Sequence, residues 1–258
     1  MDQDLTNILQ NWSYDPDDTT RIITAADGRR VLQVRLPLGI EQYELDGRPD
    51  GRTPFGRESF LEEIENRLSE YVEHLGSDDG FVLDHESSVM LQSEGVLFYY
   101  RYLLLFQMND FARVRRDTEH NLRICDLLER YAEKDEDRRA VLQYRPYIIR
   151  MNAMARAMIN VHDERRDVAL GIIQEAVDAI EGLSEVDTPA FQFEKIRSLN
   201  YLRSAVEQIS SGLVVEEAGD EGVEEGPRTR LERALAEAVE EENYERAAEI
   251  RDEIRGLT

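Results

Sequence analysis

The histidines and the cysteine are the residues whose chemistry is easiest to test from their spacing. The chain contains four histidines, which stand far apart at His74, His85, His120 and His162, and no two of them have the i, i+4 spacing that places metal ligands on one helical face. The single cysteine, Cys125, follows Ile124 in an apolar helical stretch and is predicted to be a buried small hydrophobe. The sequence therefore predicts no conventional zinc site, no catalytic residue, no cofactor and no enzymatic activity.

Two short polar segments remain as candidate ligand sites. Asp84-His85-Glu86 can bind a cation or transfer a proton, but a solvated loop before a helix is the simpler interpretation. In the segment 47–52, Gly-Arg-Pro-Asp-Gly-Arg, the glycines allow positive φ and the arginines can hold an anion, but consecutive turns leading out of the sheet are the favoured interpretation. The phosphate-binding patterns GxxxxGK[ST] and GxGxxG and the nucleophile elbow GxSxG are all absent from the sequence.

The middle of the chain is rich in arginine and tyrosine. Residues 97–166 contain 14 Lys and Arg against 11 Asp and Glu, a local charge of +3 in a chain whose net charge is −24. Tyr and Arg anchor many protein interfaces and can also stack on single-stranded bases. Three interpretations stay open: helix exteriors with arginines paired to nearby acids, a peptide groove, or a nucleic-acid surface. The residues predicted to line such a groove are Arg101, Tyr144, Arg145, Tyr147 and Arg150.

The bulk composition bounds the class of protein and its partners. A chain of 258 residues with 41% hydrophobic and 33% charged residues is long enough to bury a sizeable core. Its negative charge argues against nonspecific binding to duplex nucleic acid, which depends on neutralising phosphates. One cysteine suits a reducing compartment. Neither a signal peptide nor a membrane span is predicted, so we expect a cytoplasmic protein with a protein partner and no membrane partner.

The first domain, residues 1–57, carries the strand signals. Apolar and β-branched runs at 21–25 and 29–36 flank an Asp-Gly turn, which is the pattern of a β-hairpin, and a third run follows at 38–45. These runs predict a small antiparallel element of about three strands, which is too small to be stable alone.

The second domain, residues 58–209, reads as helical. Ser59 with Glu62 forms a capping box at the start of the first helix. A faint repeat places Asn109-Asp110 about 54 residues before Asp163-Glu164, which favours a tetratricopeptide-like array over a symmetric bundle. Pro146 is expected to kink the fourth helix. The predicted helices span 59–75, 87–108, 111–131, 137–161, 166–183 and 188–209.

The last two segments are an acidic linker, residues 210–227, and a helical hairpin, residues 228–258. The linker is rich in Gly and Glu and is predicted to be a flexible tether. Apolar residues recur at helical spacing on both sides of a polar break at Glu242-Asn243, and a hairpin of this size cannot bury its own apolar stripe. It therefore needs a partner surface. The residues predicted to contact the partner are Leu231, Leu235, Tyr244, Ala247, Ala248, Ile250, Arg251 and Ile254.

The second half of this hairpin, Tyr-Glu-Arg-Ala-Ala-Glu-Ile-Arg-Asp-Glu-Ile, resembles the UVR motif of the bacterial excision-repair proteins UvrB and UvrC and of the regulator McsA. Tyr244 stands where that family usually has Phe, and Glu242 where it usually has Leu. The resemblance implies a helical hairpin that pairs with another protein. Together with the strands and helices it is similar to bacterial UVR-containing proteins of no assigned activity.

The resulting interpretation is a mainly α-helical interaction adaptor. It comprises a small N-terminal antiparallel β element, a tetratricopeptide-like helical array and a C-terminal UVR-like hairpin. The hairpin is expected to bind a second UVR-bearing protein or a second copy of the chain. The alternative is an accessory factor in DNA excision repair that contacts DNA or repair proteins through the arginine-rich helices.

Overall fold

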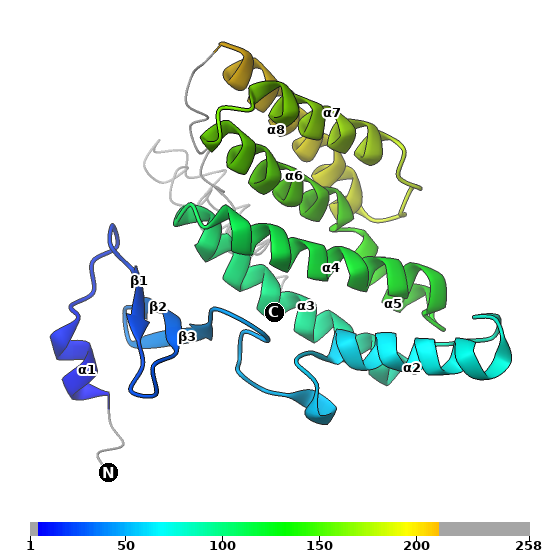
Figure 1. Ribbon diagram of the computed structural model, residues 1–258, viewed down its shortest axis with the longest axis horizontal. Coiled ribbons are helices and arrows are strands. Elements are labelled where there is room, and N and C mark those ends of the chain that lie inside the picture. Colours follow the sequence, from blue (N-terminus) through cyan, green and yellow to red (C-terminus); the bar gives the residue numbers. More distant parts are fainter. Residues whose placement is uncertain (1–4, 212–258) are drawn as a thin grey trace, which may run out of the picture. The chain divides into compact units, whose positions relative to one another are not determined.

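The computed structural model describes residues 5–211, which belong to one compact unit and are mainly helical with one small sheet (Figure 1). The predicted hairpin, 228–258, lies outside the described residues, as does the predicted linker beyond Ser211. The first two residues of that predicted linker are helical, because α8 continues through Ser211.

The N-terminal element is the predicted three-stranded antiparallel sheet. Its strands are β1 (Thr20–Thr24), β2 (Arg30–Leu36) and β3 (Gly39–Glu44), in the order β1-β2-β3. The register pairs Ile22 with Leu32 and Leu32 with Tyr43. The central strand β2 is the most buried of the three, as expected for the strand that has a neighbour on each side.

A short helix that the sequence analysis did not predict precedes the sheet. Helix α1 (Thr6–Asn11) is one and a half turns long and buries no side chain. The segment after it is held to β2 because the Arg35 guanidinium donates to the Trp12 carbonyl at 2.7 Å. The Arg21 guanidinium also stacks over the Trp12 ring, 3.8 Å from its centroid.

The helices begin close to where the sequence predicts them, with one correction. The expected kinked helix 137–161 is two helices, because the chain breaks at Gln143-Tyr144 and Pro146 occupies the first turn of a new helix, where proline is tolerated. The 3₁₀ helix η1 (Pro54–Gly56) precedes the first long helix. The α-helices are α2 (Phe60–Leu75), α3 (His85–Gln107), α4 (Phe111–Tyr131), α5 (Asp135–Leu142), α6 (Arg145–His162), α7 (Arg166–Glu181) and α8 (Pro189–Ser211).

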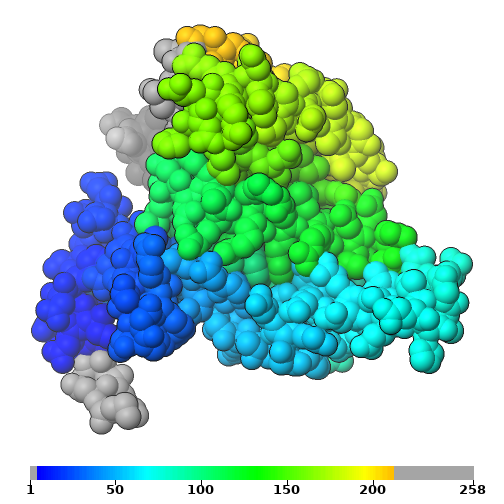
Figure 2. Space-filling view, viewed as in Figure 1, coloured from blue at the N-terminus to red at the C-terminus, as the bar shows by residue number. Residues whose placement is uncertain are grey.

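Successive helices pack side by side. Helix α3 contacts α4, α4 contacts α6, and α6 contacts both α7 and α8. In Figure 2 the green surface of α4 to α6 is continuous with the yellow-green surface of α7. One apolar cluster joins Leu32 and Leu45 of the sheet region to α3, α4 and α6, and a second joins α2 to α3 and α4. The sheet therefore shares its core with the helices, while a tetratricopeptide-like arrangement stays a prediction.

The faint repeat corresponds to two turns with the same backbone geometry. Asn109 after α3 and Glu164 after α6 both have a left-handed backbone, with φ of 58° and 59°. In each turn, the N–H of the following residue donates to the carbonyl five positions earlier: Asp110 to Leu105, and Arg165 to Asn160. This hydrogen bond defines the Schellman motif at the end of a helix. The equivalent residues are 55 apart, in agreement with the expected offset of about 54.

Candidate functional site

A buried ion pair lies where the predicted groove was expected. Arg101 of α3 and Asp117 of α4 are both fully buried, and two hydrogen bonds of 2.6 and 2.7 Å join the guanidinium to the carboxylate. A third guanidinium nitrogen donates to the carbonyls of Glu44 and Gly47, both at 2.8 Å. Because its donors are used inside the protein, Arg101 holds the end of β3 against the helices and does not line a surface groove.

Two further arginines of α4 hold the same turn. Arg116 donates to the Asp46 carboxylate and to the Leu45 carbonyl, both at 2.7 Å. Arg113 lies 3.4 Å from Asp46 and 2.7 Å from Asp110. Burial opposes ionisation of Asp46, but its hydrogen bonds and attraction to these arginines outweigh that effect and lower its pKa. The arginines of this surface are therefore neutralised by partners within the chain.

The turn segment 47–52 is held by a buried carboxylate. Arg48 donates to Asp50 at 2.8 Å and to Glu94 of α3 at 2.9 Å, and Arg52 lies 3.9 Å from Asp50. Gly47 and Gly51 have φ of 66° and 70°, which confirms the interpretation as consecutive turns that need glycine. Since Arg48 is held between two carboxylates, only the exposed Arg52 of the two predicted anion ligands stays available at the surface.

Glu94 also completes the N-terminus of α2. Its side chain is fully buried and accepts the N–H groups of Phe60 and Leu61 at 2.7 and 2.9 Å. Ser59 accepts the next N–H, from Glu62, at 3.0 Å, which confirms one half of the predicted capping box. The other half is wrong, because the Glu62 carboxylate accepts the N–H of Glu58 and not that of Ser59. Three of the N–H groups that a helix start leaves unpaired are thus satisfied, one by a capping residue and two by a residue 33 and 34 positions away.

The charges around Glu94 favour its ionised form. Burial raises the pKa of this carboxyl, but the attraction of nearby His120 and the hydrogen bonds from the two backbone N–H groups outweigh burial, so the pKa lies below its ordinary value. His120 Nε2 lies 3.2 Å from the carboxylate, and its ring stacks on Phe98 at 3.6 Å. Burial lowers the pKa of His120 although Glu94 opposes that shift, so the imidazole is favoured in its neutral form.

The five residues predicted to line a groove are divided between the interior and the surface. Tyr147 and Arg150 are buried in α6, where the Arg150 guanidinium lies 4.7 Å from the Tyr147 ring and 5.2 Å from the Tyr201 ring. Tyr144 is partly exposed just before α6. Arg145 donates to Asp126 at 2.6 Å and pairs with Glu129. The structure therefore brings Tyr147 and Arg150 together and leaves the predicted set dispersed.

Arg145 does line a pocket of about 440 Å³. The pocket lies between α5, the start of α6, and the loop that precedes α8. Leu142 and Phe191 give it an apolar floor, and the charges around them have both signs. The lining residues are Glu129, Asp135, Arg138, Arg139, Leu142, Arg145, Leu183, Ser184, Glu185, Val186, Asp187 and Phe191.

Cys125 and two further arginines of the middle segment have structural roles. Cys125 is fully buried, and burial raises the pKa of its thiol to about 12, as expected for a structural cysteine. Arg123 binds Glu65 through two hydrogen bonds, and Arg138 binds Asp135 and two carbonyls. The interpretation of the middle segment as helix exteriors with paired arginines is therefore confirmed for these residues.

Sequence reasoning missed Glu94, and it took Asp117 for one of the acids that pair with arginines on helix exteriors, whereas Asp117 is buried with Arg101. Both stand in helical stretches among ordinary surface residues, and no motif marks them. The available signal was weak: Glu94 lies between apolar positions Leu91 and Phe98 and therefore shares a helical face with them.

Comparison with known families finds one match, the UvrB/uvrC motif (UVR), at residues 228–257. This match falls on the segment whose sequence resembles that motif and covers no other part of the chain. No match to a curated protein was found. No solved structure matched either.

Within residues 5–211, no helix combines the length and the apolar character that crossing a bilayer requires.

Proposed function

We propose that this chain is a nonenzymatic adaptor that binds a UVR-bearing protein, or a second copy of itself, through residues 228–257. The observation that carries the proposal is the match to the UvrB/uvrC motif over those residues. The apolar spacing in the sequence supports it: Leu231, Leu235, Tyr244, Ile250 and Ile254 recur at helical intervals. The paired alanines, Ala247 and Ala248, suit a close approach between two helices, and Arg251 beside them suits a charge that sets register.

An adaptor also needs a second surface, and we assign that role to the pocket beside Arg145. Its apolar floor and its arginines and carboxylates of both signs suit the side chains of a peptide segment. A volume of about 440 Å³ is in the range of small binding pockets and accommodates a few side chains. The groove is therefore proposed at Arg145, Arg138 and Leu142, and not at Arg101 or Arg150.

The test separates the two surfaces by affinity capture from the source organism with three baits. The double variant Tyr244→Ala, Ile254→Asp should lose the partners that the motif recruits, because it removes an aromatic anchor and introduces a charge into the contact. Ser184→Trp should lose the partners of the pocket by filling it, and Ser69→Trp, on the exposed face of α2, is its control. Retention of all partners by the double variant would contradict the adaptor proposal.

The alternative, an accessory role in excision repair, is favoured by the name of the motif alone. If it holds, we propose contact with repair proteins and not with DNA, since Arg113, Arg116, Arg123 and Arg138 are paired within the chain. Titration with single- and double-stranded DNA at physiological salt should show no binding. Submicromolar binding that weakens steeply with added salt would instead support the DNA-contacting role.

A further inference from the structure

The segment Asp84-His85-Glu86 is not the solvated loop that its sequence suggests. Asp84 caps α3 by accepting the N–H of Ser87 at 2.8 Å, and His85 is the first residue of that helix. The preceding residue, Leu83, exchanges two backbone hydrogen bonds with the chain after α4: its N–H donates to Tyr131 at 2.8 Å and its carbonyl accepts from Glu133 at 2.9 Å. The starts of α3 and α5 are therefore fixed side by side.

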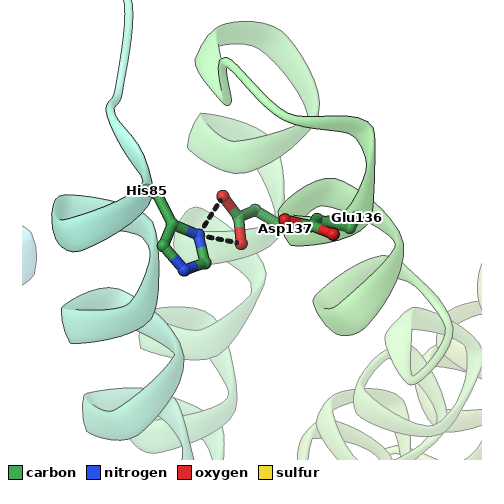
Figure 3. A group of neighbouring side chains, drawn as sticks. All are labelled: His85, Glu136 and Asp137. Atoms are coloured by element: carbon green, nitrogen blue, oxygen red, sulfur yellow. Dashed lines mark hydrogen bonds and ion pairs between the residues drawn. The ribbon is translucent and has the colours of Figure 1, made fainter.

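This arrangement brings three ligand-type side chains together. His85 of α3 faces Glu136 and Asp137 of α5 (Figure 3), and one ligand atom from each lies within 4.8 Å of the others. His85 and Glu136 are exposed, whereas the Asp137 side chain is only 5% exposed. A cation can thus reach the group from solvent, while the buried carboxylate gives it a fixed ligand.

The contact between His85 and Asp137 leaves the buried carboxylate incompletely satisfied. Nδ1 of His85 lies 2.9 Å from both Oδ1 and Oδ2, so one N–H is shared between two acceptors. Among the described residues no other hydrogen-bond donor reaches these oxygens. A buried carboxylate is stable only when its charge is compensated, and one shared N–H leaves room for a cation to take part in that compensation.

The same distance suits two ligands of one metal ion. Ligand atoms about 2.1 Å from a metal are about 3.0 Å apart at an octahedral angle and about 3.4 Å apart at a tetrahedral one, so the pair at 2.9 Å needs to open by at most about half an ångström to admit an ion. One imidazole with two carboxylates is a mixed nitrogen and oxygen donor set of the kind that first-row divalent ions accept. Three protein ligands leave the other coordination positions to water.

We propose that His85, Glu136 and Asp137 form a binding site for a first-row divalent transition-metal ion. The ion joins the first turns of α3 and α5 and binds the Asp137 carboxylate on its solvent side. The site does not include residues 228–257. An experiment that disproves metal binding therefore leaves the adaptor proposal untouched, and the reverse also holds.

The test is isothermal titration of the full-length protein with ZnCl₂, with circular dichroism to check folding and thermal melts with and without zinc. His85→Gln and Glu136→Gln, both at exposed positions, should each weaken zinc binding at least about tenfold and abolish the rise in melting temperature. His162→Gln is the matched control, because His162 is also exposed and precedes two acids, Asp163 and Glu164, on the described surface. It should bind zinc like the wild type.

The carboxylate is tested separately with Asp137→Asn, because this side chain is buried. If the variant is folded by circular dichroism, it should lose zinc binding as His85→Gln does. If it is unfolded, the two exposed variants decide the result. Equal zinc affinity in wild type, His85→Gln and Glu136→Gln would overturn the proposal, and so would an absence of saturable binding by the wild type.

Discussion

The two ends of the helical unit are joined by different kinds of contact. At the N-terminal end, the sheet and the turn after it are held to α3 and α4 by buried charges: Arg101 with Asp117, and Arg48 with Glu94. At the C-terminal end, α6 packs against α7 and α8, and most buried residues of α6 and α7 are small or apolar. The buried charge of α6 that reaches α8 is Arg150, which stacks over the Tyr201 ring. The buried alanines of α6, α7 and α8 are Ala153, Ala155, Ala157, Ala169, Ala176 and Ala205.

The difference follows from what each end must join. A three-stranded sheet has little apolar surface to bury against the helices. The turn after it also has backbone carbonyls that need hydrogen-bond donors, and the backbone N–H groups of the helices are already used. Arginine side chains supply those donors. Two helices instead satisfy their own backbone groups and gain stability from close contact, which alanine permits. The N-terminal junction should therefore be sensitive to loss of charge and the C-terminal one to added volume.

The largest expected effect is from Asp117→Ala, which leaves the Arg101 guanidinium buried without its counter-ion. We expect a loss of about 3–5 kcal/mol in the free energy of unfolding, measured by urea denaturation. Glu65→Ala is the matched control, because Glu65 binds Arg123 through the same two-hydrogen-bond geometry at the surface. That change should cost less than about 1 kcal/mol. Similar losses in the two variants would contradict the assignment of Arg101 and Asp117 as the main anchor of the sheet.

The next effect is from Glu94→Gln, which places an amide group against the N–H donors of Phe60 and Leu61. We expect the free energy of unfolding to fall by about 1.5–3 kcal/mol at neutral pH. The glutamine has only one oxygen, so one of the two N–H groups then faces an NH₂ group in place of a charged acceptor. The pKa of Glu94 is lowered in the folded protein, so its contribution is present above the ordinary value of 4.5 and is lost as pH falls through the folded pKa.

A pH series of urea denaturations tests this effect further. The difference between wild type and Glu94→Gln should shrink as pH falls below about 4.5. His120 adds a separate step: its pKa is lowered below the ordinary 6.5, so the unfolded chain binds more protons and stability begins to fall below that pH. A stability difference that stays constant down to pH 3 would show that folding does not lower the pKa of Glu94.

At the C-terminal junction the corresponding test adds volume. Ala157→Leu in α6 inserts three carbon atoms at a fully buried position, and overpacking of this kind costs about 1–3 kcal/mol. Ala112→Leu, at an exposed position of α4, controls for the change in helix propensity and should have little effect. Thermal melts of both variants measure the difference. If the two variants melt alike, α6 is packed less closely than the structure shows.

The smallest effect comes from the two equivalent turns. Glu164 adopts a left-handed backbone that favours glycine, so Glu164→Gly should stabilise the protein by about 1 kcal/mol. Asn109→Gly at the equivalent position should change stability little, because asparagine tolerates this conformation. Melting temperatures of the two variants and the wild type test whether the two turns differ only in the residue that adopts the left-handed backbone. Destabilisation by Glu164→Gly would show that its side chain makes a contact that outweighs the backbone strain.

The secondary structure was largely predictable from local patterns. The strands around the Asp-Gly turn and the cap at Ser59 were confirmed because turn residues, β-branched runs and capping side chains act within a few positions of one another. The break before Pro146 was misread as a kink, since a proline suits both a kink and a helix start. The candidate groove was not predictable, because Arg101 and Arg145 look alike in sequence and only one of them is buried.

What the sequence determined by itself is the part of this protein that depends on short-range spacing: the order of strands and helices, the small sheet, and the resemblance at residues 228–257 that the UvrB/uvrC motif match supports. Only the tertiary structure decided how charged residues are used. Glu94 meets Phe60 and Leu61 across more than thirty residues, Arg101 meets Asp117 across sixteen, and His85 meets Asp137 across fifty-two. The reason is physical: the pairing of a charge depends on burial and on which helices pack together, and neither is encoded in the residues beside it.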